Sequence, residues 1–186
     1  MKFSIARLWP LFWQKGGDIN MFNLGSMLNL GSTEPVIGSA STIVECSASE
    51  LFKYIGENLF QNYPKWSPEV KELEKITAGP VQFGTIGRQV RVDQGRRSES
   101  RFKISDFTPE KRLTFSGVSD PYRCSYELQA GDLDNSTKLI FTFELLELLV
   151  IMRPFEGLVR ASIKDGVTRT VQNIKRLVET EKLKHE

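Results

Sequence analysis

The feature that most constrains the fold is a succession of alternating apolar and polar residues between residues 86 and 145. Apolar side chains recur there at every second position, in segments separated by Gly, Pro, Asp and Asn. A period of two places those side chains on one face of a β-strand, and short turns favour pairing between successive strands. The sequence therefore predicts an antiparallel meander with one apolar face.

One long amphipathic segment follows the meander, from about residue 153 to residue 182. Its apolar residues recur at helical spacing and are Phe155, Leu158, Val159, Ile163, Val167, Val171, Ile174, Leu177 and Val178. An apolar stripe of this length needs an apolar partner surface, and the meander offers one. The predicted fold class is therefore α+β, an antiparallel sheet covered by a long C-terminal helix.

Residues 37–46 are predicted to form the first strand, because small and β-branched residues dominate there. At the end of this strand Ser47 and Glu50 have the spacing of a capping box, which predicts the start of a helix. The apolar face of this helix would hold Leu51, Phe52, Ile55 and Leu59.

A second short helix is predicted to begin at residue 67. The first helix is expected to end before Tyr63 and Pro64, because proline disrupts a helix interior. Ser67 can then cap a new helix, and Pro68 suits its first turn. Two short helices would thus follow the first strand and form a lid.

The turn at residues 93–95 is predicted to be a three-residue hairpin loop, with Gly95 in a left-handed conformation. This loop length pairs Arg88 with Ser100 and brings the apolar sets of both strands to one side. Arg88 would then face inward with Ile86, Val90 and Val92. The positions predicted to face solvent on this strand are Gln89 and Arg91.

Several segments, in this order, resemble the START-like superfamily and its helix-grip fold. They are Val44–Phe52, Trp66–Val70, Phe83–Thr85, Ile104–Pro109 and Ile174–Glu179. The resemblance covers roughly residues 35–179 and is closest to the polyketide cyclase/dehydrase-like, or SRPBCC, branch. It implies a curved sheet wrapped around the C-terminal helix, with a cavity between them that the short helices and loops gate. Members of this branch mostly bind hydrophobic small molecules and only sometimes catalyse reactions.

Inward-facing side chains of the strands and the helix would line this cavity. Large aromatic residues would bury a ligand there, and a few polar groups would orient it. The predicted ligand-binding residues are Arg88, Val90, Ser100, Phe102, Phe115, Tyr122, Cys124, Tyr126, Phe141, Phe143, Ile163, Val167 and Thr170. No catalytic residue is assigned.

Three of these residues have more than one interpretation. Arg88 either reaches the rim of the sheet or anchors a ligand anion, because a guanidinium on an apolar face needs a polar partner. Tyr122 and Tyr126 are either core aromatics or general acids. Cys124 is interpreted as a small core hydrophobe with an unreactive thiol, since no base accompanies it in the pattern.

These features leave three functions open. The leading hypothesis is a module that binds a lipid, an isoprenoid or an aromatic polyketide by burying it. The second is a cyclase, aromatase or dehydratase in which the pocket tyrosines and Arg88 orient a polyketone and move protons. The third is a protein-interaction domain, because the resembled superfamily includes a co-chaperone.

Composition argues against several other classes. The chain has 25 Lys and Arg against 23 Asp and Glu, a balance that gives no basis for nucleic-acid binding. Its two cysteines, Cys46 and Cys124, and its single histidine, His185, match no zinc site or disulfide framework. The sequence predicts neither a metal nor a cofactor.

The N-terminal residues 1–34 are predicted to be a flexible leader, followed by the ligand-binding domain at 35–182 and a charged tail at 183–186. Trp9, Phe12 and Trp13 lie among basic residues of the leader, and contact with a membrane or a second subunit is an alternative role for them. No export signal is recognised, so a cytoplasmic location is expected.

Overall fold

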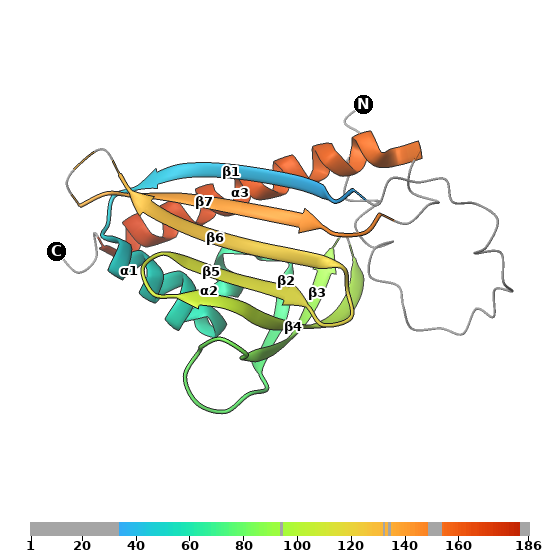
Figure 1. The fold of residues 1–186 in the computed structure, drawn as a ribbon, viewed down its shortest axis with the longest axis horizontal. Coiled ribbons are helices and arrows are strands. Elements are labelled where there is room, and N and C mark those ends of the chain that lie inside the picture. The colour runs from blue at the N-terminus through green and yellow to red at the C-terminus, as the bar shows by residue number, and fades with distance from the viewer. Residues whose placement is uncertain (1–33, 94, 132, 134, 149–153, 183–186) are drawn as a thin grey trace, which may run out of the picture.

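The computed structural model describes residues 34–93, 95–131, 133, 135–148 and 154–182. It contains a seven-stranded sheet and three α-helices, with a π-helical segment between the first two (Figure 1). The strands are β1 (Val36–Val44), β2 (Val70–Lys75), β3 (Ile86–Asp93), β4 (Arg96–Thr108), β5 (Arg112–Gly117), β6 (Tyr122–Ala130) and β7 (Thr137–Leu145). The helices are α1 (Ala48–Phe52), the π-helix η3 (Lys53–Glu57), α2 (Leu59–Trp66) and α3 (Glu156–Lys182). Leader residues 1–33, with the aromatic segment at 9–13, and the tail with His185 lie outside the described residues.

The sheet is antiparallel throughout and has the order β1-β7-β6-β5-β4-β3-β2. Strands β2 to β7 form a meander, and β1 joins it by pairing with β7. The sheet curves, with α3 running along β1 and the short helices lying near one end (Figure 1). The predicted α+β helix-grip fold is therefore confirmed.

The join between β1 and α1 has the predicted capping box. The hydroxyl oxygen of Ser47 accepts a hydrogen bond from the backbone N–H of Glu50 at 3.2 Å, and the Glu50 carboxylate accepts from the backbone N–H of Ser47 at 2.9 Å. These bonds satisfy donors that a helix start leaves unpaired. The chain consequently turns directly from strand to helix.

The second short helix lies earlier than predicted. Helix α2 runs through Pro64 to Trp66, and β2 begins at Val70, at the place of the predicted second helix. Leu59, Tyr63 and Trp66 share one face of α2 and are buried. Burial of large side chains on that face outweighs the hydrogen bond that the proline removes.

The predicted register of the β3–β4 hairpin is wrong by one residue. Asp93 pairs with Arg96, so the loop contains two residues, and Gln89 pairs with Ser100. Gly87 lies opposite Phe102, whose ring would be 2.4 Å from a Cβ at that position. The glycine therefore lets the aromatic ring lie across β3, and the whole inward set of this strand changes.

Helix α3 packs closely on one edge of the sheet. A Cβ at Gly38 of β1 would lie 2.4 Å from Cγ2 of Ile163, and the Lys175 ammonium donates a hydrogen bond to the backbone oxygen of Ile43 at 2.8 Å. The buried side of α3 holds Val159, Ile163, Val167, Val171, Ile174 and Val178. Phe155 and Leu158, which were assigned to the same stripe, are each nearly half exposed at the start of the helix.

Candidate functional site

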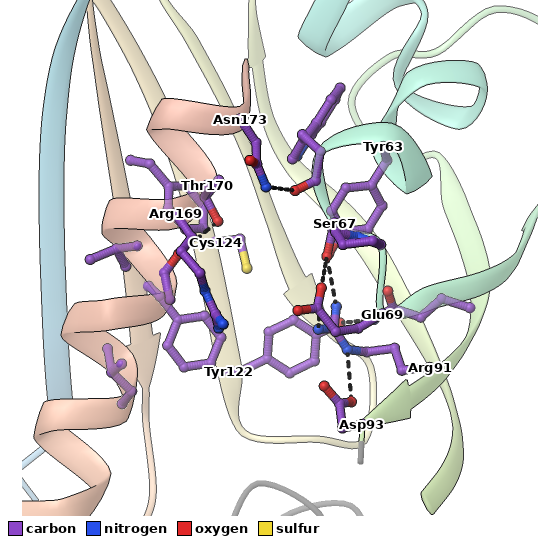
Figure 2. A pocket seen from close by; sticks show the side chains of 18 of the residues that line it. Tyr63, Ser67, Glu69, Arg91, Asp93, Tyr122, Cys124, Arg169, Thr170 and Asn173 are labelled. Carbon is purple, nitrogen blue, oxygen red and sulfur yellow. Dashed lines mark hydrogen bonds and ion pairs between the residues drawn. The ribbon is translucent and has the colours of Figure 1, made fainter. Parts of the chain in front are cut away.

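A cavity of about 420 Å³ lies between α3, the inner face of the sheet and the connection from α2 to β2. Its volume falls in the range of about 300–1,000 Å³ that small-molecule sites occupy. The lining residues are Tyr63, Trp66, Ser67, Pro68, Glu69, Gln89, Arg91, Asp93, Tyr122, Cys124, Tyr126, Phe141, Phe143, Ser162, Ile163, Gly166, Val167, Arg169, Thr170 and Asn173. Figure 2 shows the walls that α3, the sheet and the connecting segment contribute.

Space remains in the cavity because α3 lacks a side chain at Gly166. A Cβ at this position would meet no atom within 4 Å. The same helix touches β1 at Gly38, where a Cβ would collide with Ile163. The helix is thus packed tightly against one strand and leaves room beside Gly166.

The apolar part of the cavity comes from alternate residues of β6 and β7. The rings of Tyr126 and Phe141 lie 4.6 Å apart, and those of Tyr122 and Phe143 stack at 6.2 Å. Ile163 and Val167 of α3 face these rings across the cavity. Together they form a surface suited to a hydrophobic ligand.

The polar part of the cavity centres on the buried guanidinium of Arg91. It donates to the hydroxyl oxygen of Ser67 at 3.3 Å and lies 3.5 Å from the carboxylate of Asp93 and 3.9 Å from that of Glu69. Burial raises the pKa of Asp93, and the positive charge of Arg91 opposes that rise. Arg169 of α3 brings a second cation to the opposite wall (Figure 2).

Gln89 supplies an unsatisfied acceptor beside this cavity. Its amide nitrogen donates to the hydroxyl oxygens of Ser100 and Tyr122, each at 3.2 Å. The residue is 1% exposed, and its Oε1 is buried without a hydrogen-bond partner in the part of the chain that the structure describes. Leaving a buried acceptor unpaired costs about 1–3 kcal/mol.

The tyrosine and cysteine side chains of β6 stay protonated at neutral pH. Burial raises the pKa of Tyr122 and of Tyr126 well above the usual phenol value, and raises the pKa of the Cys124 thiol to about 12. The Tyr126 hydroxyl also accepts a hydrogen bond from the indole N–H of Trp66 at 3.3 Å. These groups can pack and form hydrogen bonds, but they are poorly tuned for proton transfer at pH 7.

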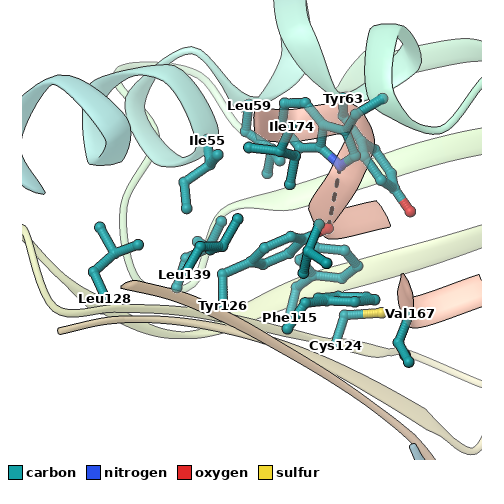
Figure 3. Packing of buried hydrophobic residues seen from close by; sticks show 14 of the residues in the cluster. Ile55, Leu59, Tyr63, Phe115, Cys124, Tyr126, Leu128, Leu139, Val167 and Ile174 are labelled. Carbon is teal, nitrogen blue, oxygen red and sulfur yellow. Dashed lines mark hydrogen bonds between the residues drawn. The ribbon is translucent and has the colours of Figure 1, made fainter. Parts of the chain in front are cut away.

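Eight of the predicted ligand-binding residues line the cavity: Tyr122, Cys124, Tyr126, Phe141, Phe143, Ile163, Val167 and Thr170. Contact with a ligand remains a prediction for all of them. Ser100 lies behind Gln89, to which it is hydrogen-bonded. Phe102 and Phe115 belong to an adjacent aromatic core, where their ring centroids lie 4.8 Å apart. Phe115 also contacts the ring of Tyr63 (Figure 3).

Arg88 and Val90 do not lie where they were predicted. The Arg88 guanidinium forms two hydrogen bonds of 2.7 Å with the Glu99 carboxylate and one of 3.3 Å with Glu72 on the outer side of the sheet. Val90 is buried, but it lies on the same face of β3 as Arg88 and outside the main core cluster. The hairpin register explains both errors, because a shift of one residue exchanges the two faces of a strand.

The residues that sequence reasoning missed are mainly the polar ones. Gln89, Arg91 and Asp93 of β3 face the cavity, and they recur at every second position in phase with Gly87. That alternation was a usable signal, but it competed with the more apolar set of Ile86, Val90 and Val92. A second missed group, residues 67–69, lies in the connection that had been predicted as helical.

Neither a metal site nor a membrane span emerges from the described residues. No group of three or more His, Cys, Asp or Glu side chains is arranged there to hold a metal ion. None of the helices in this part of the chain combines the length and apolarity needed to cross a membrane.

A curved antiparallel sheet that holds a long C-terminal helix, with a cavity between the two, defines a START-like, helix-grip domain. The chain belongs to the family described as polyketide cyclase/dehydrase and lipid transport, which it matches over residues 36–179. No curated protein matches the sequence significantly.

Solved structures share this fold at low sequence identity. A norcoclaurine synthase point mutant from Thalictrum flavum, in complex with a transition-state analogue, is 17% identical with a TM-score of 0.64, covering 82% of this chain and 99% of its own. A protein from Thermus thermophilus is 14% identical with a TM-score of 0.61, covering 78% and 98%. A polyketide-cyclase-like protein from Corynebacterium glutamicum is 15% identical with a TM-score of 0.58, covering 82% and 96%.

Proposed function

We propose that this domain binds a hydrophobic small molecule, such as a lipid, an isoprenoid or an aromatic polyketide, inside the cavity beside α3. The observation that carries the proposal is the cavity itself, about 420 Å³ in volume, with aromatic and aliphatic walls and a localised polar region. Burying roughly 200 Å² of apolar ligand surface contributes about 5 kcal/mol. The family description, which includes lipid transport, points to the same class of ligand.

Gly166 offers a test that leaves the fold in place. A leucine there would project from an open helix position into the cavity. Gly157, also on α3, is the control position, because a Cβ added there would also meet no atom within 4 Å, but the residue lies outside the cavity. We would titrate the full chain with the uncharged dye N-phenyl-1-naphthylamine and follow its fluorescence. Saturable binding at one site, lost in Gly166→Leu and kept in Gly157→Leu, is the expected result.

Two outcomes would contradict the proposal. In one, the wild-type protein shows no saturable dye binding and native mass spectrometry finds no molecule retained after incubation with host extract. In the other, Gly166→Leu binds the dye as tightly as Gly157→Leu, although circular dichroism shows both variants folded. Either result would shift attention to the outer surface and to protein partners.

A cyclase, aromatase or dehydratase activity has less support in the site. That chemistry was attributed to the pocket tyrosines and Arg88, but Arg88 points to the outer side of the sheet. The raised pKa values of Tyr122 and Tyr126 make both phenols weak acids at neutral pH. Binding without turnover is therefore the function that the geometry supports best.

A further inference from the structure

Gln89 has a hydrogen-bonding requirement that no other residue in the described part of the chain meets. Its amide nitrogen donates to the hydroxyl oxygens of Ser100 and Tyr122, each 3.2 Å away. The carbonyl oxygen of the same amide is buried and unpaired within the described residues. Gln89 lines the cavity, and a turn of its amide side chain would bring the closed-off Oε1 to that space, where a group on a bound molecule can supply the missing partner.

The charged side chains that line the cavity already balance one another. Gln89, Arg91 and Asp93 occupy successive inward positions of β3, each about 7 Å from the next along the strand. Glu69 and Arg169 are the other charged residues in the cavity lining. The two cations and two carboxylates sum to zero when all are ionised. A ligand carboxylate would add a third negative charge, and a ligand ammonium a third positive one, in a partly buried site where like charges repel strongly.

We infer that the ligand carries an uncharged hydroxyl group, as an alcohol or a phenol, and that this hydroxyl binds the Gln89 amide while the hydrophobic remainder packs against β6, β7 and α3. This inference rests on the proposed function and narrows its ligand class. A hydroxyl fits because it can donate a hydrogen bond to Oε1. If the amide were flipped so that Nε2 took the place of Oε1, the same hydroxyl could accept a hydrogen bond from Nε2. A hydrocarbon would leave the buried amide unsatisfied.

Three probes of one shape test the inference. 2-Naphthol, 2-naphthoate and naphthalene share a ring system and differ in the group offered to Gln89. We would measure their displacement of N-phenyl-1-naphthylamine at pH 7, where the naphthol is uncharged and the naphthoate is ionised. The naphthol should bind about tenfold more tightly than either of the others, the ratio expected when one buried hydrogen bond is gained.

Substitution of the amide should remove this preference. In Gln89→Leu, naphthalene should bind at least as tightly as the naphthol, while the control Gln129→Leu, at an exposed position of β6, should keep the tenfold ratio. Gln89→Met serves as a second variant of similar length should the leucine variant fail to fold.

The remaining outcomes separate the two proposals. Three outcomes would overturn the hydroxyl inference and still leave the cavity as a binding site. The naphthoate could bind most tightly, the naphthol and naphthalene could bind equally, or the preference for naphthol could persist in folded Gln89 variants. Failure of the dye and all three probes to bind would overturn the proposed function and this inference with it.

Discussion

Alanine substitutions at Gly38 and Gly166 should change stability in opposite directions. At Gly166 a methyl group meets no atom within 4 Å, so the dominant effect is the replacement of a helical glycine, worth about 1 kcal/mol of added stability. At Gly38 the new Cβ would lie 2.4 Å from Cγ2 of Ile163 and 3.5 Å from its backbone carbon. Overpacking of this kind destabilises a core by about 1–3 kcal/mol.

Urea unfolding followed by circular dichroism at 25 °C measures both effects, provided that the transition is two-state. Thermal unfolding should show a rise of about 2–4 °C for Gly166→Ala, as expected for a domain of this size gaining about 1 kcal/mol. Gly157→Ala is the matched control, because it has the same open surroundings on the same helix. The double variant Gly38→Ala with Ile163→Ala should be less destabilised than the sum of its single variants, since the second change removes the clash.

The signs of the two effects decide whether the helix placement is right. A destabilised Gly166→Ala would mean that the cavity is filled by packed side chains. An unchanged Gly38→Ala would mean that α3 does not approach β1 closely. Either result would refute the account of how one helix both closes the core and leaves room for a ligand.

Three further predictions concern buried polar groups. Arg91→Leu should lower the free energy of unfolding by about 3 kcal/mol, because it leaves two partly buried carboxylates uncompensated. Arg88→Leu, on the solvent side, should have a small effect in the same urea assay. The stability of the wild type relative to Asp93→Asn should increase as the pH falls from 7 to 4. Burial raises the pKa of Asp93 in the folded state above its ordinary value of 3.8, so the folded state binds the proton more tightly than the unfolded state does. The resulting stabilisation is complete below pH 3.8. In a Cys46→Ala background, Cys124 should react with iodoacetamide at pH 8 about a thousandfold more slowly than a free cysteine, since burial raises its pKa to about 12.

Each of these has a contradicting result. Equal losses of stability in the two arginine variants would place Arg91 in solvent. A pH profile of Asp93→Asn parallel to that of the wild type would mean that the Asp93 carboxyl is not buried. Rapid alkylation of Cys124 in the folded protein would show that its thiol is open to solvent or that the cavity wall opens readily.

Much of the fold follows from local sequence because several elements each carry one dominant pattern. The inward residues of β6 from Tyr122 to Leu128 and of β7 from Leu139 to Leu145 are all apolar or aromatic, so the orientation of both strands was predicted correctly. The capping box at Ser47 and the stripe of α3 are equally local signals. Helix α2 could not be placed in this way, because burial of Tyr63 and Trp66 against the sheet, a tertiary effect, overrides the local effect of Pro64.

The largest error fell on β3, and the reason is functional as well as geometric. Hydrophobic patterning assigns the more apolar face of a strand to the core, and on β3 that face carries Ile86, Val90 and Val92. The cavity reverses the rule, because a binding site needs polar groups inside the fold, and β3 provides them with Gln89, Arg91 and Asp93. A strand whose polar face points inward therefore marks the polar wall of the site, and conflicts between local pattern and global fold are expected where function imposes them.

Gly38 and Gly166 together set how α3 borders the cavity. Gly38 holds α3 close to β1, and Gly166 leaves the helix without a side chain where the cavity lies. Because these positions are separate, cavity volume can change through residue 166 while the contact at residue 38 is preserved. On the proposed function, ligand size would depend on α3, and recognition of the ligand's polar group would depend on β3. Substitutions at Gly166 should accordingly alter which ring systems fit, and substitutions at Gln89 should alter which functional group is preferred.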